Sequence, residues 1–183
     1  MLRVLVGITL SVALVVVFLL STTKADPLQP GASAPALTSV DENGKPVNLA
    51  DTFKKGLTLV YFYPKADTPG CTKEACALRD KWEDVQKLGI TVIGVSMDTP
   101  EAQKAFKDKY KLPFTLLADT EGAVVKAFGV AMIRVGVPTR QSFLVKEGKI
   151  VWHDPKVDPV THLDNVIKAA GDLAKAPAPA EKK

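Results

Sequence analysis

The stretch LTLVYFYPKADTPGCTKEAC, residues 57–76, decides the fold and contains both cysteines of the chain. Its first part, Leu57 to Tyr63, is an apolar run rich in β-branched and aromatic residues, which predicts a buried strand. The prolines and glycine that follow predict a turn, and the turn opens a helix at about Cys71. A helix N-terminus presents unpaired N–H groups and positive partial charge, so it favours the thiolate form of a cysteine. The stretch therefore indicates reactive sulfur.

The rest of the chain alternates strand and helix patterns. Apolar residues at three- and four-residue steps predict one helix from Cys71 to Leu88, where Gly89 ends it. The expected elements are a hairpin over 37–49 that turns at Asn43-Gly44, strands at 57–63, 91–96 and 114–117, helices at 71–88, about 98–110, 122–128 and 159–173, and a second hairpin of strands 142–145 and 149–152. This order predicts an α/β fold, with a mixed central β-sheet flanked by helices and an N-terminal β-hairpin.

The composition is that of one globular domain and excludes several kinds of protein. The chain has 183 residues, 46% of them hydrophobic, which suits a single domain with its own core. The net charge is +4, and removing Arg3 and Lys24 of the N-terminal segment leaves +2. Basic residues alternate with acidic ones and form no stripe with aromatics, so we expect no nucleic-acid partner. Two histidines and two cysteines at these spacings make no zinc site, and we expect no metal and no cofactor.

The first 25 residues have the pattern of a targeting segment. Arg3 supplies one positive charge before an uncharged apolar run from Val4 to Leu20. This is typical of a secretory signal peptide cleaved after Ala25. The alternative is an uncleaved membrane anchor at the short end of the spanning length. In both cases we expect export to the periplasm or another extracytoplasmic space, with any membrane attachment through residues 1–25.

Two further segments flank the expected domain, which covers residues 37–173. Residues 26–36 hold three prolines and predict an extended linker. Residues 174–183 alternate proline and alanine before a charged end, which is typical of a disordered tail.

The motif around the first cysteine resembles that of a known family. Pro64-x-x-x-Thr68-x-x-Cys71 is similar to the signature of peroxiredoxins, and its flanks within residues 61–75 resemble the subfamily known as bacterioferritin comigratory protein. The resemblance extends over about residues 35–173. It implies a thioredoxin-like fold and a thiol-specific peroxidase, which reduces hydrogen peroxide and organic hydroperoxides to water and alcohols in antioxidant defence.

The resemblance also implies roles for individual residues. A second segment, PTRQSFLV at 138–145, is similar to the one that carries the family's active-site arginine, here Arg140. By this resemblance Cys71 is the peroxidatic cysteine, and Cys76 resolves its sulfenic acid in an intramolecular disulfide. The other pocket residues correspond to Pro64, Thr68 and Arg140. The family likeness further implies a thioredoxin-like reductant, and we expect the protein to be a monomer.

The residue types in this segment suit the cleavage of a peroxide. A guanidinium stabilises negative charge on sulfur and on the leaving oxygen. The Thr68 hydroxyl can both accept from and donate to a bound hydroperoxide. Pro64 and Pro69 fix the turn and present no N–H of their own. The segment, together with a nearby guanidinium, therefore supplies the groups that such a reaction requires.

The spacing of the two cysteines sets a geometric condition on any disulfide between them. Residues five apart in an ideal helix are related by ~7.5 Å of rise and ~140° of rotation, which puts their Cα atoms ~8.6 Å apart. A disulfide needs a Cα separation below ~7 Å. Cys71 and Cys76 therefore cannot bond while one intact helix holds both. We predict a reduced form with the helix complete from about Cys71 and an oxidised form with it melted past Cys76.

Several alternatives stay open at the level of the residues. A thiol–disulfide oxidoreductase of thioredoxin type would need Cys-x-x-Cys, and a redox sensor or holdase would use the disulfide as a switch. A purely structural disulfide would close too small a loop to stabilise much. Glu74 either favours the helix N-terminus or orients Arg140. His153 and His162 have no acid/base partner visible in the sequence, so we expect them to be structural or surface residues.

Overall fold

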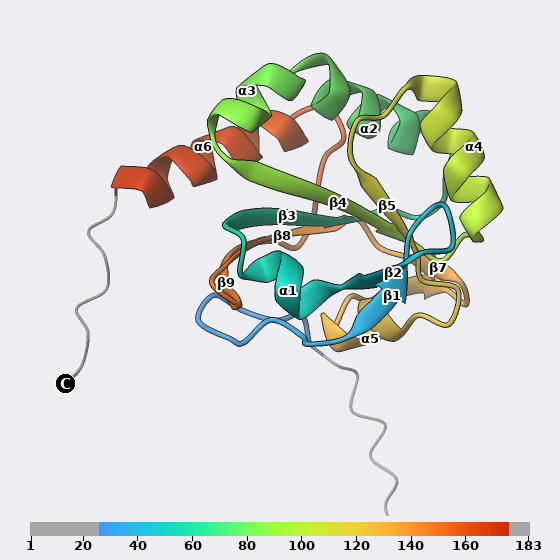
Figure 1. Ribbon diagram of the computed structural model, residues 1–183, viewed down its shortest axis with the longest axis horizontal. Coiled ribbons are helices and arrows are strands. Elements are labelled where there is room, and N and C mark those ends of the chain that lie inside the picture. Colours follow the sequence, from blue (N-terminus) through green and yellow to red (C-terminus); the bar gives the residue numbers. More distant parts are fainter. Residues whose placement is uncertain (1–25, 176–183) are drawn as a thin grey trace, which may run out of the picture.

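Five strands form the central sheet, in the order β5-β4-β3-β8-β9 (Figure 1). The structure is a computed structural model that describes residues 26–175. The strands are β3 (Leu57–Phe62), β4 (Ile90–Ser96), β5 (Thr115–Ala118), β8 (Gln141–Lys146) and β9 (Lys149–Asp154). β3, β4 and β5 are mutually parallel, whereas β8 runs antiparallel to β3 and β9 antiparallel to β8. The predicted mixed sheet of an α/β fold is confirmed.

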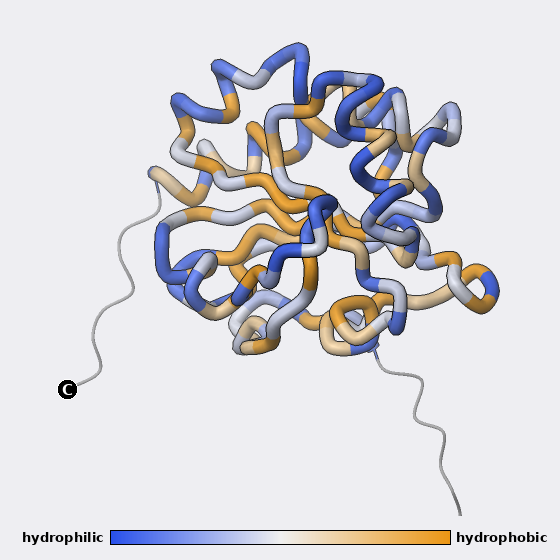
Figure 2. Tube along the Cα trace, turned by 45° about the vertical axis from the view of Figure 1, so that its right-hand side comes forward, coloured by the Kyte–Doolittle hydropathy of each residue, from blue (hydrophilic) through white to orange (hydrophobic). Residues whose placement is uncertain are grey.

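Helices cover both faces of this sheet (Figure 1). On one face lie α2 (Pro69–Asp80), α3 (Trp82–Lys87), α4 (Pro100–Tyr110) and α6 (His162–Lys175), and on the other α1 (Leu49–Phe53) and α5 (Ala123–Ala127). Leu59 and Tyr61 of β3 join the first core cluster, while Val60 and Phe62 join the second. Because both faces are buried, the strands are nearly continuous apolar runs, the most hydrophobic part of the trace in Figure 2.

The long helix predicted over 71–88 is wrong in two respects. It begins two residues earlier, at Pro69, because proline suits the first helical position. It also breaks at Lys81, whose φ of −110° and ψ of 25° depart from helical values, and α3 then starts at Trp82. The apolar spacing continues through the break because both helices pack on the same core cluster. Periodicity alone therefore did not reveal the boundary.

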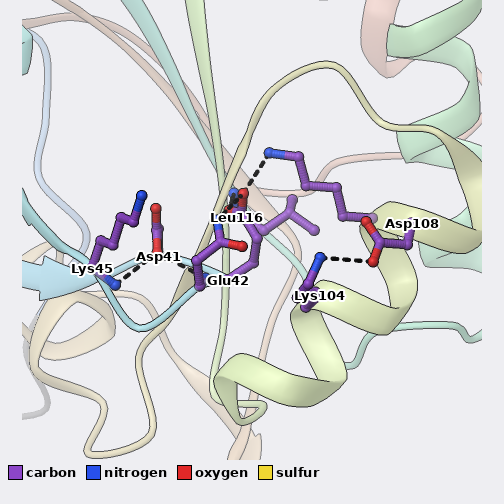
Figure 3. A network of polar contacts seen from close by, with 8 residues as sticks. Asp41, Glu42, Lys45, Lys104, Asp108 and Leu116 are labelled. Atoms are coloured by element: carbon purple, nitrogen blue, oxygen red, sulfur yellow. Dashed lines mark hydrogen bonds and ion pairs between the residues drawn. The ribbon is translucent and has the colours of Figure 1, made fainter.

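The predicted N-terminal hairpin is present and is fastened to the domain. β1 (Thr38–Val40) pairs with β2 (Pro46–Asn48), and Gly44 takes a φ of 72° in the turn between them. Beside this turn the buried carboxylate of Glu42 accepts hydrogen bonds from Lys107 Nζ at 2.6 Å and from Leu116 N at 3.0 Å (Figure 3). These bonds tie the hairpin to α4 and to β5.

A second small hairpin, of β6 (Met132–Arg134) and β7 (Val137–Pro138), precedes β8. The sequence indicated no structure for this segment beyond a Val/Gly-rich loop. The Thr139 backbone N–H and hydroxyl both donate to the Ala131 carbonyl, at 2.8 and 3.0 Å, and close the hairpin. Ile133 and Val135 on it are 65% and 97% exposed.

The predicted terminal segments are only partly described. The targeting segment, residues 1–25, lies outside the described residues. The linker predicted over 26–36 is attached to the sheet edge, since Gly31 N donates to Ile150 O and Ala34 N to Gly148 O, both at 2.8 Å. Residues 174 and 175 of the predicted tail belong to α6, and the rest lie outside the described residues. Within residues 26–175, no helix is both long and apolar enough to cross a bilayer.

Candidate active site

The turn between β3 and α2 carries the candidate nucleophile to the carboxyl edge of the sheet. Tyr63 N donates to Val95 O at 3.0 Å and prolongs the strand contact. Pro64 follows directly and is partly buried, and it offers no N–H to the turn. Ala66 N then donates to the Asp98 carboxylate at 2.7 Å, which fixes the loop to the end of β4. The turn is thus held by hydrogen bonds before the helix starts.

Cys71 lies in the first turn of α2 and is 1% exposed. Its Sγ is 3.0 Å from Thr68 Oγ1 and 3.2 Å from Arg140 Nη2. Thr68 is the N-cap residue, yet its side chain makes no capping bond to the helix. Its hydroxyl instead lies 3.0 Å from both the sulfur and the Lys65 carbonyl. The first-turn N–H groups therefore stay available, and they add positive partial charge beside the sulfur.

Arg140 reaches this sulfur because of the strand order. β8 pairs antiparallel with β3, and the register sets Phe62 opposite Gln141, so the residue before β8 lies beside the β3–α2 turn. The guanidinium donates from Nη1 to Glu74 Oε2 at 2.7 Å and from Nη2 to Cys71 Sγ. A Cβ added at Gly70 would lie 2.7 Å from Arg140 Nη2, so glycine there permits the close approach.

Glu74 continues the network away from the sulfur. Its side chain is 0% exposed, and its second oxygen, Oε1, is 3.0 Å from His162 Nδ1 at the start of α6. The other ring nitrogen of His162 lies 2.8 Å from Ser142 Oγ on β8. The open question about Glu74 is answered in favour of a contact with Arg140. The His162 contact was not predicted, because it joins α2 to α6, which begins far along the chain.

Cys76 occupies a different environment in the same helix. It is reduced and only partly buried, and Arg79 lies one turn further on. The Asp80 carboxylate raises the pKa of Arg79, and the Cys76 sulfur contributes to the same shift. Arg79 Nη1 donates to the Tyr110 carbonyl at 2.7 Å and joins the end of α2 to the end of α4. Both cysteines therefore lie in one continuous helix, without a bond between them.

Two tyrosines, Tyr61 in β3 and Tyr63 directly after it, belong to the same core cluster as Cys71. Tyr61 and Tyr63 are stacked with ring centroids 5.4 Å apart, and both are buried. Burial, followed by the charge on neighbouring groups that include Cys71, raises the pKa of Tyr61 well above its usual range. Burial also raises the pKa of Tyr63, whose hydroxyl donates to Gln103. Both phenols are therefore neutral, and they surround the network with a medium of low polarity.

The described residues offer no arrangement for a metal. Within residues 26–175, no group of three or more His, Cys, Asp or Glu side chains is placed to hold an ion. Of the five predicted residues, Thr68 and Arg140 both contact the Cys71 sulfur. Pro64 lies in the turn before the helix, and Cys76 lies further along α2.

Comparison with known proteins assigns this constellation to a family. The family model described as AhpC/TSA family matches residues 30–153. The chain belongs to this family. Its homologues are peroxiredoxins: it is 42% identical over 146 residues to "Peroxiredoxin Q, chloroplastic" of Sedum lineare, covering 78% of each chain. It is also 42% identical over 141 residues to "Putative peroxiredoxin bcp" of Coxiella burnetii, covering 72% of this chain and 92% of that one.

Solved peroxiredoxins share the fold as well as the sequence. A Xanthomonas campestris peroxiredoxin Q structure superposes with a TM-score of 0.73 at 30% identity, covering 84% of this chain and all of that one. Peroxidoxin BcpB of Mycobacterium tuberculosis gives 0.75 at 26% identity, covering 80% and 98%. The thioredoxin-like fold and the predicted subfamily are thereby confirmed. The protein is an enzyme, a peroxidase of the thiol-dependent class.

Proposed function

We propose that the chain reduces hydroperoxides through the thiolate of Cys71. The sulfur attacks one peroxide oxygen and the O–O bond breaks. Sulfur is oxidised to sulfenic acid, and the other oxygen leaves with a proton as water or an alcohol. The Cys76 thiol then attacks the sulfenic sulfur, which forms a Cys71–Cys76 disulfide and releases water. A dithiol reductant of thioredoxin type exchanges with this disulfide and returns both cysteines to thiols.

One observation carries the proposal: Cys71 Sγ lies within 3.0 Å of a hydroxyl and 3.2 Å of a guanidinium. Negative charge is on sulfur before the attack and on the leaving oxygen after it. Arg140 Nη2 and the free N–H groups of the first turn of α2 lie beside the sulfur, so they favour the thiolate and would stabilise charge on an oxygen bound next to it. Thr68 can exchange its hydrogen bond to sulfur for one to the bound peroxide.

The resolving step requires α2 to open. Both thiols lie within the helix Pro69–Asp80 in the reduced form. At this spacing the Cα atoms of an intact helix are too far apart for a disulfide. We therefore expect the stretch from Cys71 to Arg79 to unwind in each cycle. Amide hydrogen exchange in the reduced and oxidised forms measures this directly, and equal protection of the stretch in both would contradict it.

The likeness to relatives supports the proposed substrate range. A solved Xanthomonas campestris structure, 29% identical to this chain, concerns the alkyl peroxide reduction activity of a bacterioferritin comigratory protein. We extend that activity to this chain and include hydrogen peroxide and organic hydroperoxides as substrates.

The place of action and the oligomeric state are part of the proposal. We infer an exported, monomeric enzyme, with residues 1–25 as a cleaved signal or an anchor. The reductant is then an extracytoplasmic dithiol protein. Fractionation of cells that make the full chain, followed by mass spectrometry of the mature N-terminus, tests the export and the cleavage. Full-length protein in the cytosolic fraction would overturn them.

Two cysteine variants test the catalytic cycle. With an added dithiol donor, we expect Cys71→Ser to consume no peroxide, because the attacking sulfur is gone. Cys76→Ser should react once, form a stable sulfenic acid, and turn over again when a small thiol is supplied. Peroxide consumption by Cys71→Ser at the wild-type rate would overturn the proposal. Reduction of insulin by wild-type protein, with slow peroxide consumption, would instead favour a thiol–disulfide oxidoreductase.

A further inference from the structure

The buried contact between His162 and Glu74 has no place in the reaction described above. His162 is the first residue of α6 and is 1% exposed. Its Nδ1 lies 3.0 Å from Glu74 Oε1, yet the two atoms do not form an aligned hydrogen bond, and neither has another partner. A misaligned contact between buried atoms gains little from a neutral imidazole. It gains much more when the ring carries a positive charge opposite the carboxylate.

The charges around Cys71 also favour a positive charge on His162. When the sulfur is a thiolate, a single guanidinium on Arg140 faces two anions, the sulfur at 3.2 Å and Glu74 Oε2 at 2.7 Å. One positive and two negative charges would then share a buried site, which is costly in a medium of low polarity. An imidazolium at His162 supplies the second positive charge. The two cations then balance the two anions.

The remaining surroundings of His162 are compatible with that charge. From β3 the ring of Tyr61 lies with its centroid 5.8 Å away, and this phenol is neutral. From β8 the hydroxyl of Ser142 lies 2.8 Å from Nε2 and can accept its hydrogen. In the loop before α6, the Asp158 carbonyl accepts from the His162 backbone N–H. From α2 the facing group is the Glu74 carboxylate, with Arg140 beyond it.

We propose that His162 is a positioning residue for the peroxidase reaction, which as an imidazolium holds the Glu74 carboxylate and so keeps Arg140 directed at Cys71. This inference rests on the proposed function. It also gives the contact a role in the cycle, because Glu74 lies between the two cysteines in α2. Unwinding of α2 for the disulfide removes Glu74 from His162, so the contact favours the folded, reactive form over the resolving form.

The matched pair His162→Gln and His153→Gln tests the inference. His153 is the other histidine of the chain; it lies on β9, partly exposed, and contacts Gln141. Quenched-flow mass spectrometry measures the rate at which hydrogen peroxide oxidises Cys71, from about pH 5 to 9. We expect His162→Gln to react about tenfold more slowly, and we expect a fall in rate at alkaline pH in wild type that is absent from this variant. His153→Gln should behave as wild type.

A double variant separates positioning from simple damage to the fold. In a Glu74→Gln background the carboxylate is gone, so the further change His162→Gln should have an effect of less than about twofold. A wild-type rate and pH profile for folded His162→Gln would overturn the inference. Absence of peroxide reaction in wild type would instead overturn the proposed function.

A spectroscopic measurement on wild type keeps the inference testable even where variants fail to fold. The ¹⁵N chemical shifts of a histidine distinguish imidazolium from both neutral tautomers. We expect those of His162 to report an imidazolium in the reduced protein at neutral pH, and to change on disulfide formation when Glu74 moves away. A neutral ring in the reduced protein would contradict the charge that the inference assigns.

Discussion

The two halves of α2 hold identical thiols in opposite surroundings. In the first half, Cys71 is buried and meets a hydroxyl and a guanidinium through its sulfur. In the second half, Cys76 is partly exposed, and the neighbouring Arg79 is bonded to the Tyr110 carbonyl at the end of α4. The structure therefore gives the Cys71 sulfur polar and charged partners in place, whereas the Cys76 thiol is more accessible, as the proposed cycle of attack and resolution requires.

Replacing the two arginines, Arg140 and Arg79, should show the largest difference between the two halves of α2. Replacing Arg140 by Met removes the donor nearest the sulfur and leaves Glu74 buried without its cation, so the rate of Cys71 oxidation should fall by about a hundredfold or more. Replacing Arg79 by Met removes a similar charge from the other half of the helix. Its effect on the same rate should stay within about twofold. Rapid-mixing kinetics with hydrogen peroxide measure both, and equal losses would show that the two halves do not differ in function.

The Thr68 variants test how much a single hydroxyl contributes to the reactivity of Cys71. Thr68→Val keeps the shape of the side chain and removes the group that lies 3.0 Å from Cys71 Sγ. A hydrogen bond to a charged group contributes about 1.5–3 kcal/mol, so the oxidation rate should fall by about tenfold to a hundredfold. Thr68→Ser restores the hydroxyl and should recover most of that loss. Thr68→Val with a wild-type rate would mean that this hydroxyl serves the turn alone, through its contact with Lys65 O.

At Gly70 we expect a substitution to lower the oxidation rate of Cys71 by a smaller factor without lowering the stability. In Gly70→Ala the new Cβ would lie 2.7 Å from Arg140 Nη2, and the flexible guanidinium would have to shift away from the sulfur. We expect a loss of about threefold to tenfold in the oxidation rate. Alanine also favours the helical state by about 0.5–1 kcal/mol over glycine, so the thermal midpoint should stay the same or rise. A fall in both would indicate general damage to the turn.

Local patterns predicted the elements of this fold better than their ends and their partners. The strand Leu57–Phe62 and the turn into α2 followed from an apolar run and from proline and glycine, which act over a few residues. The break at Lys81 did not, because both helices keep the apolar spacing of one core face. The contact of Arg140 with Cys71 came only from a family motif, since its physical cause is the antiparallel pairing of β8 with β3.

The contact of His162 was not predicted from the sequence for the same reason, namely that it depends on tertiary structure. The residues around position 162 do not indicate Glu74 as a partner, because Glu74 is brought to His162 by the packing of α2 on α6. A buried ionisable pair of this kind depends on tertiary structure alone. The two ionisable side chains that meet there gave separate and weaker signals in the sequence, one as a helix-start acid and the other as a structural histidine.

The smallest expected effect concerns the turn that precedes α2, where Asp67 accepts from Lys109 Nζ at 2.8 Å and from Tyr110 Oη at 2.7 Å. These hydrogen bonds lower the pKa of Asp67 below its ordinary value of 3.8. A carboxyl group with a lowered folded-state pKa stabilises the protein above its unfolded value, and that contribution disappears as the pH falls through the folded value.

The variant Asp67→Asn removes the charge and tolerates the left-handed backbone, which has a φ of 55° at this position. Its thermal midpoint should be slightly below that of wild type at neutral pH, and the two should converge as the pH falls below 3.8. The oxidation rate of Cys71 should not change, because Arg140 and Thr68 keep their contacts with the sulfur. A difference in midpoint that persists at low pH would mean that the turn is held by Asp67 through its shape and not through its charge.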